Sequence, residues 1–383
     1  MACLNSPRTA AGAYELTKNL LIKAHAEYDI NYRGYLANHL PHGLYTLCAL
    51  GASTSRLQQF YDKYVKKLEP ISKTSTVIDS SNWETNIGCK GSYSDYLRYF
   101  DNELEVKGLK NTFDLYFSQL MGESLGAALH PLINIGYAME FKNPILLSEG
   151  LAYVCITPLR DTSKILNNAD VIGASSDTTI FQLIEELQSI KFPEIHNDGW
   201  NFQRKTEFLL ENYGMVFRDL IAKWDLTQGD KLLDKLNELT EASILAVFGT
   251  YPKQIDFFLL HGLTGNHAVR ILFQNLPEAL QRQILKVNLL GFLTDYVVQR
   301  CPKVDINFIT GYKETNGNLT WDVILDKTIS TDEVHVPKVI RCLTHFMEAV
   351  PLPQRSKLFT DTFLKQCAIK LVDIVQEEED FLF

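Results

Sequence analysis

Apolar residues recur at helical spacing along almost the whole chain, and this periodicity constrains the fold more than any other feature. Segments 14–28, 40–50 and 93–106 place apolar side chains three and four residues apart, between short polar or Gly/Pro breaks. Such spacing puts the apolar side chains on one face of an α-helix. Similar segments fall at 55–68, 111–120, 125–141, 145–156, 181–190, 204–224, 230–248, 253–275, 280–300, 337–350 and 355–377. The sequence therefore predicts an all-α protein.

The length of 383 residues fits one large domain or two ordinary ones. No fixed-period repeat is evident, which argues against a solenoid. We predict one compact multi-helix domain over residues 1–383, with a possible internal connection at the Ser/Asp/Asn-rich segment 157–179. Turn-forming residues within 307–325 could include a short hairpin.

Composition excludes several classes of protein. The net charge of −9 and the lack of a basic run argue against a nucleic-acid partner. No apolar run approaches the roughly 18 residues of a membrane span, and the first residues lack the apolar segment of a signal peptide. The seven cysteines are scattered singly, as expected of reduced thiols. We therefore expect a cytoplasmic protein without a membrane partner. The sequence does not set its oligomeric state.

Two of the predicted helices carry histidine where polar residues are unexpected. "NHLPHGLYTLCALGAS" places His39 and His42 where a helix turns apolar. In "LHPLINIGYAME", Asn134 and Tyr137 share the helix face of His130, and Pro131 suggests a break at that histidine. Buried polar groups need partners. The polar residues on this helix face therefore indicate a polar network or a bound ligand.

Two later segments repeat the pattern. His261 lies in "DFFLLHGLTGNH", where Gly262 weakens the helix and allows a close approach to its backbone. In "HVPKVIRCL", His335 and Lys338 lie three residues apart at the start of a helix. Burial would depress the pKa of such a lysine by several units. A deprotonated lysine amine can react with carbon dioxide to form a carbamate, which is a carboxylate-like metal ligand.

Imidazoles that converge from separate helices are how helical bundles build metal centres. Several His ligands with one carboxylate-type oxygen suit iron, with zinc, copper and nickel as competitors. A single core histidine is more often only hydrogen-bonded, and we assign that role to His25, His196, His267 and His345. By the same reasoning, Lys338 taken alone would be a surface lysine.

The segments that contain His39, His130, His261 and His335 occur in an order that resembles the questin oxidase-like family. That resemblance implies an all-helical fold and oxygen-dependent, Baeyer–Villiger-like opening of anthraquinone rings. It further implies a non-haem iron held by these four histidines and a carboxylated Lys338. Other members can have Met at the position of His42, which is therefore assigned to the pocket lining.

We accordingly predict an oxygenase that inserts oxygen into, or cleaves, a ring of a quinone-type polycyclic aromatic substrate, with dioxygen as co-substrate. His42, Asn134 and Tyr137 are the candidate catalytic residues. Asn134 stands where fungal members tend to have a further histidine, a difference that bears on substrate. No Gly-x-Gly-x-x-Gly motif follows a predicted strand, so no Rossmann domain is expected. Reducing equivalents would come from the substrate, a partner, or an external reductant such as NADPH.

Two alternatives belong to other classes. Histidines with a carbamylated lysine also suit a metal-dependent hydrolase. That site would need bridging Asp or Glu residues, and no inward acid recurs beside the histidines. A non-enzymatic all-α binding protein is the second alternative, in which the histidines satisfy one another and the acidic tail "QEEEDFLF" is an interaction segment. Metal analysis and dioxygen consumption distinguish these possibilities.

Overall fold

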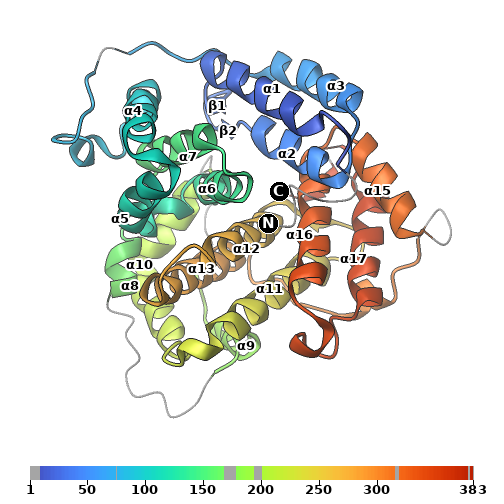
Figure 1. The fold of residues 1–383 in the computed structure, drawn as a ribbon. Coiled ribbons are helices and arrows are strands. Elements are labelled where there is room, and N and C mark those ends of the chain that lie inside the picture. Colours follow the sequence, from blue (N-terminus) through green and yellow to red (C-terminus); the bar gives the residue numbers. More distant parts are fainter. Residues whose placement is uncertain are drawn as a thin grey trace. The chain divides into compact units, whose positions relative to one another are not determined.

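The computed structural model describes residues 9–74, 76–167, 178–193, 201–314, 319–377 and 380–382. The described residues are mainly helical and contain only short strands, which confirms the predicted all-α class (Figure 1). They divide into two compact units. The first comprises Met1–Pro158 and Asp322–Arg341, and the second Leu159–Trp321 and Cys342–Phe383. The single domain over residues 1–383 stays a prediction.

The first unit is built around α6 and α7, which pack side by side and are contacted by α4 and α2 (Figure 1). Its helices are α1 (Ala13–Glu27), α2 (Leu40–Leu50), α3 (Thr54–Tyr64), α4 (Tyr93–Thr112), α5 (Ser118–Leu120), α6 (His130–Phe141), α7 (Pro144–Ile156) and nearly all of α15 (Trp321–Ser330), with the first residues of α16 (His335–Ala349). Short 3-10 or π turns lie at Val65–Lys67, Glu84–Asn86, Lys90–Ser92, Phe113–Phe117 and Gly122–Leu125. Strands β1 (Asn31–Tyr32) and β2 (Leu36–Ala37) pair antiparallel just before α2.

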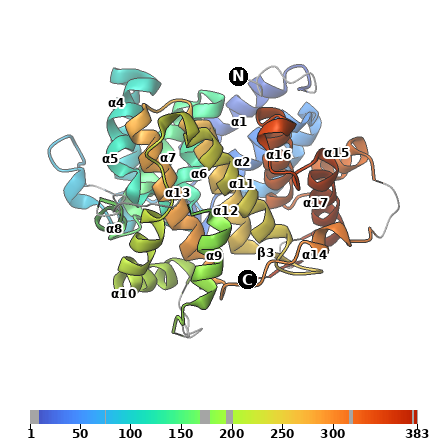
Figure 2. The same ribbon diagram turned by 90° about the horizontal axis from the view of Figure 1, so that it is seen from below.

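The second unit centres on α11, α12 and α13, which lie together in both views (Figure 2). Its elements are α8 (Thr162–Asn167), α9 (Ile180–Ser189), α10 (Phe202–Ala222), α11 (Leu232–Phe248), α12 (Phe257–Phe273), α13 (Glu278–Val298), α14 (Asn307–Thr310) and α17 (Asp361–Ile374), with 3-10 turns at Gly229–Lys231 and Leu352–Gln354. Strand β3 (Ile255–Asp256) pairs parallel with β4 (Phe381–Leu382). None of the described helices combines the length and apolar character needed to cross a bilayer.

Three helices of the first unit start at a histidine or directly after one. In each case a proline follows that histidine within two residues. His39 is the N-cap of α2 and precedes Pro41. His130 and His335 are the first residues of α6 and α16, and they precede Pro131 and Pro337. Proline suits a first helical turn because its missing N–H would have no partner inside the helix. The sequence therefore fixes each histidine at a helix N-terminus.

Several predicted boundaries are wrong. Helix α6 begins at His130 and not at residue 125, because Ala127, Ala128 and Leu129 have φ values of 47°, 52° and 64°. Gly126 and Ala127 therefore lie before the helix. Left-handed backbone at residues other than glycine is strained, and such strain is often found beside functional sites.

Helix α12 also starts later than predicted. Its N-cap is Asp256, whose carboxylate accepts hydrogen bonds from the N–H groups of Phe258 and Leu259, both at 2.9 Å. Instead of the possible hairpin, the described parts of segment 307–325 contain α14 and the start of α15. The described part of connection 157–179 contains α8, whereas residues 168–177 lie outside the described residues.

His25 joins three helices of the first unit. Its Nδ1 lies 2.9 Å from Glu149 of α7, and its Nε2 lies 3.2 Å from Asp101 of α4. Burial alone would lower the pKa of His25, but hydrogen bonds to Asp101 and then Glu149 outweigh it and raise the pKa to about 10. The imidazolium form therefore holds α1 against α4 and α7.

This arrangement predicts a pH-dependent stability. The folded pKa of about 10 exceeds the ordinary 6.5, so the charged His25 stabilises fully below pH 6.5 and progressively less as the pH rises through 10. His25→Ala should cost about 2 kcal/mol at pH 6, a typical value for hydrogen bonds to charged groups. Urea unfolding at pH 6, 8 and 10 should show the difference shrinking with pH. A difference that is constant over this range would contradict the prediction.

Candidate metal centre

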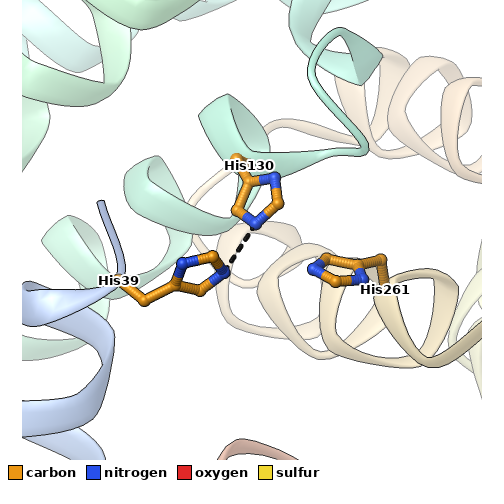
Figure 3. A group of neighbouring side chains, drawn as sticks. All are labelled: His39, His130 and His261. Atoms are coloured by element: carbon orange, nitrogen blue, oxygen red, sulfur yellow. Dashed lines mark hydrogen bonds between the residues drawn. The ribbon is translucent and has the colours of Figure 1, made fainter. Parts of the chain in front are cut away.

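The imidazoles of His130 and His335 both approach that of His39 in the first unit. The Nε2 atom of His39 is 2.8 Å from Nε2 of His130 and 3.2 Å from Nε2 of His335. The three rings are buried and meet edge to face, with centroids 4.6 and 4.7 Å from that of His39. Figure 3 shows the rings of His39 and His130, with a dashed line between the two Nε2 atoms. The three helix starts thus bring three Nε2 atoms together.

The other ring nitrogen fixes the tautomer of each imidazole. Nδ1–H of His39 donates to the carbonyl of Ala37 at 2.7 Å, and Nδ1–H of His130 donates to the carbonyl of Ala127. Nδ1–H of His335 donates to the carboxylate of Glu333 at 2.5 Å. A carbonyl oxygen can only accept, so the proton must reside on Nδ1. In the neutral rings, every Nε2 of this cluster therefore carries a lone pair.

Lone pairs that face one another at these distances repel unless a proton or a cation lies between them. Burial, followed by the charge of Lys338, holds the pKa of His39 and of His130 well below the ordinary value. Burial also lowers the pKa of His335, against the raising effect of Glu333. Protonation is therefore disfavoured. Two imidazole nitrogens about 2.1 Å from one ion and at right angles would be about 3.0 Å apart. The observed spacings fit a metal ion.

Helix N-termini contribute to the same electrostatics. His39, His130 and His335 each stand at the positive end of a helix dipole. That potential disfavours an imidazolium ion and keeps the rings neutral, as metal ligation requires. It also disfavours a bound cation, so negative charge close to the cluster becomes valuable.

Lys338 lies one turn along α16 from His335 and is only 1 % exposed. Its charge lowers the pKa values of His39, His42, His130 and His335, second to burial for the first three, which places its amine close to the cluster. The surface-lysine interpretation is therefore wrong. Its inward direction follows from the spacing of three residues, which puts both side chains on one helix face.

His42 is close to the cluster but differs from it in tautomer. Its Nε2–H donates to Oδ1 of Asn134, so its lone pair is on Nδ1. Its ring lies 5.6 Å from that of His39 and 4.9 Å from that of Tyr137. Within the described residues, neither Nδ1 of His42 nor Nδ2 of Asn134 has a hydrogen-bond partner, although both side chains are 1 % exposed. The structure thus brings the three candidate catalytic residues together.

Tyr137 is held by its hydroxyl and by its ring. The hydroxyl lies 2.6 Å from Oγ1 of Thr46, and the Arg341 guanidinium lies 5.7 Å from the ring centroid. Arg341 in turn pairs with Glu140. These contacts link α2, α6 and α16 around the histidine cluster.

Glu333 was missed by the sequence interpretation, which expected no inward acid beside the histidines. Its side chain is only 9 % exposed, and one of its oxygens, Oε1, accepts from both the backbone N–H and Nδ1–H of His335. The only sequence signal was a carboxylate two residues before a histidine at a helix start. Because Oε1 contacts the ring at Nδ1, away from Nε2, this acid does not supply the bridge that a two-metal hydrolase needs.

His261 belongs to the second unit, where it is fully buried on α12. The ring of His261 is labelled in Figure 3. Its Nδ1–H donates to the carbonyl of Phe257 at 2.7 Å, so in the neutral ring its Nε2 also carries the lone pair. Its place in the centre stays a prediction. His267 and His345 pair edge to face within the same unit, with ring centroids 4.8 Å apart. His196 lies outside the described residues.

Comparison with known proteins relates this chain to a family with members named as oxidoreductases. A family model described as questin oxidase-like matches residues 36–343, a range that includes all five predicted ligands. The chain is 26% identical over 365 residues to oxidoreductase AflY of Aspergillus parasiticus, covering 88% of this chain and 72% of that protein. It is 23% identical over 358 residues to questin oxidase of Aspergillus terreus, covering 87% and 80%.

A third relative, Baeyer-Villiger monooxygenase dmxR6 of a Cryptosporiopsis species, is 25% identical over 355 residues, covering 85% of this chain and 79% of that protein. The family match spans most of the chain, so the protein belongs to the questin oxidase-like family. The names of these relatives support an oxidoreductase.

The converging lone pairs predict that single substitutions weaken metal binding. His39→Ala, His130→Ala and His335→Ala should each lower the affinity for a divalent metal by about 10-fold or more, since even changes beyond the ligands typically cost 10- to 100-fold. His261→Ala tests whether the imidazole of the second unit belongs to the same centre, and the same loss is expected. Chelator competition with metal-free protein measures the affinities. His25→Ala is the control, and full affinity in all four other variants would refute the site.

Proposed function

We propose that this protein is a non-haem iron oxygenase of the Baeyer–Villiger type, acting on quinone-type polycyclic aromatic substrates. The observation that carries the proposal is the set of Nε2 lone pairs turned toward one another around His39. The family match and the names of the relatives support the choice of reaction. Imidazole nitrogens with one hard oxygen donor suit iron among the metals found in proteins.

The ligands we propose are His39, His130 and His335 of the first unit, His261 of the second, and Lys338. The shared tautomer supports this set, because all four imidazoles donate through Nδ1, so that in the neutral rings each Nε2 carries the lone pair. His42 is excluded on the same ground, since its Nε2 donates to Asn134. The sequence interpretation separated His42 from the ligands, and the hydrogen bonds favour the same division.

Lys338 would serve as a carboxylated lysine. An ammonium group in a buried cluster that binds a cation would repel that cation. Carboxylation reverses the sign: the neutral amine attacks the carbon of carbon dioxide, a C–N bond forms, a proton leaves, and a carbamate anion results. The near-complete burial of Lys338 and its electrostatic effect on the imidazoles support this role.

Bound ferrous iron would supply activation of dioxygen. In the overall reaction, one oxygen atom enters the bond between a ring carbonyl carbon and its neighbour, so that one C–C bond breaks and two bonds to oxygen form. The second oxygen atom leaves as water and takes up two electrons and two protons. These come from the substrate or from an external reductant such as NADPH.

His42, Asn134 and Tyr137 would hold the substrate. The lone pair on Nδ1 of His42 can accept a hydrogen bond from a phenolic hydroxyl, and Nδ2 of Asn134 can donate to a carbonyl oxygen. Both atoms are buried, and a buried polar atom left without a partner costs about 1–3 kcal/mol, which a bound substrate would recover. Tyr137 would present its ring to a flat aromatic surface.

The function is tested with labelled dioxygen. Iron-loaded protein given a hydroxyanthraquinone and a reductant should consume dioxygen and form a product heavier by one oxygen atom that derives from ¹⁸O₂. His42→Phe should retain iron but lower kcat/KM by about 10-fold or more, as expected from a lost substrate hydrogen bond and an unpaired partner. His25→Ala should react normally. Oxygen incorporated from water alone, without dioxygen uptake, would instead identify a hydrolase.

Lys338 has a test of its own. Lys338→Ala should lose iron or oxygenase activity while far-UV circular dichroism remains helical, and short carboxylic acids should restore part of the function by occupying the vacated position. Carbon-13 NMR with labelled bicarbonate should detect the carbamate in the unmodified protein. Full iron content and activity in Lys338→Ala would leave a site of histidines only. The matched control is Lys63→Ala, which removes an exposed lysine that pairs with Asp332.

A further inference from the structure

The acceptors of the cluster's Nδ1 protons are not equivalent. His39 and His130 donate to backbone carbonyls, as does His261 within its own unit. His335 donates to a carboxylate, that of Glu333, at 2.5 Å. A carboxylate draws the Nδ1 proton more strongly than a carbonyl does, so it raises the electron density at Nε2 of the same ring.

Glu333 is built into this position. Its own N–H donates to Oγ1 of Thr331 at 3.1 Å, and its Oε1 accepts from the backbone N–H of His335 at 2.9 Å. These hydrogen bonds hold the Glu333 carboxylate against the Nδ1–H side of the His335 ring.

The positive potential around the cluster favours a negative charge at Glu333. Three helix N-termini direct their positive ends at the cluster, and a bound cation would add to this charge. Lys67 is exposed and lies 3.9 Å from the ring centroid of Tyr64, whose hydroxyl accepts the backbone N–H of His39 at 3.0 Å. Glu333 thus carries negative charge next to the imidazole that it orients.

We propose that Glu333 is a positioning residue that sets the electron-donating strength of the metal centre through His335, tightening metal binding and stabilising the oxidised ion. This inference rests on the proposed function, because it requires that the cluster bind a redox metal. It is distinct from the ligand set, since Glu333 contacts Nδ1 and not Nε2. Its removal should therefore weaken the site without abolishing it.

The experiment compares Glu333→Gln with Asp332→Asn. Glutamine keeps an oxygen that can accept from His335 but carries no charge. Asp332 is the adjacent acid and pairs with Arg56 and Lys63 at the surface. The substitution Asp332→Asn therefore removes the same charge from a residue that pairs with these cations. Each protein is prepared metal-free and titrated with ferrous iron, and the midpoint potential of the iron-loaded form is then measured.

Glu333→Gln should bind iron about 10-fold more weakly and show a more positive midpoint potential, with metal-free unfolding close to that of the unmodified protein. Asp332→Asn should match the unmodified protein in both. Unchanged affinity and potential in Glu333→Gln would overturn the inference, as would a loss of affinity matched by a loss of metal-free stability. Failure of the unmodified protein to bind any metal would instead overturn the proposed function.

Discussion

The contact on which the site depends is the approach of Nε2 of His39 to Nε2 of His130 and His335, at 2.8 and 3.2 Å. The lone pairs of three neutral rings repel one another at these distances, so the contact does not stabilise the rings by itself. Each is held there by other bonds: carbonyls at Ala37 and Ala127 and the carboxylate of Glu333 hold the Nδ1 protons, and three helix starts position the rings. The fold therefore stores repulsion that a bound cation would relieve, which is how a preorganised metal centre is built.

Much of this arrangement could be predicted from local sequence. Helical periodicity placed α2 at Leu40–Leu50 with the observed bounds, and most other helices within a few residues. Proline shortly after His39 and His335 marked two helix starts, because proline favours the first turn and disfavours the interior. Pro131 indicated only a break at His130, where the third helix in fact starts. The spacing of His335 and Lys338 predicted a shared face, and Lys338 is indeed buried.

The remainder depends on contacts that no local pattern encodes. The left-handed run at Ala127–Leu129 contradicts the helical propensity of alanine and leucine, and it accompanies the hydrogen bond from Nδ1–H of His130 to the carbonyl of Ala127. Glu333 was overlooked because its partner lies two residues away, outside the i+3 and i+4 spacing of helix pairs. Tautomers, which separate His42 from the ligands, follow only from tertiary hydrogen bonds.

X-ray absorption at the iron K edge, on protein purified with its metal, is the sharpest test of the proposed metal centre. We predict iron with a first shell of nitrogen and oxygen donors near 2.1 Å and the outer-shell scattering of several imidazole rings. Such a spectrum would mean that the Nε2 lone pairs around His39 surround an ion. Absence of iron, or a shell that contains sulfur at about 2.3 Å, would contradict the centre as described.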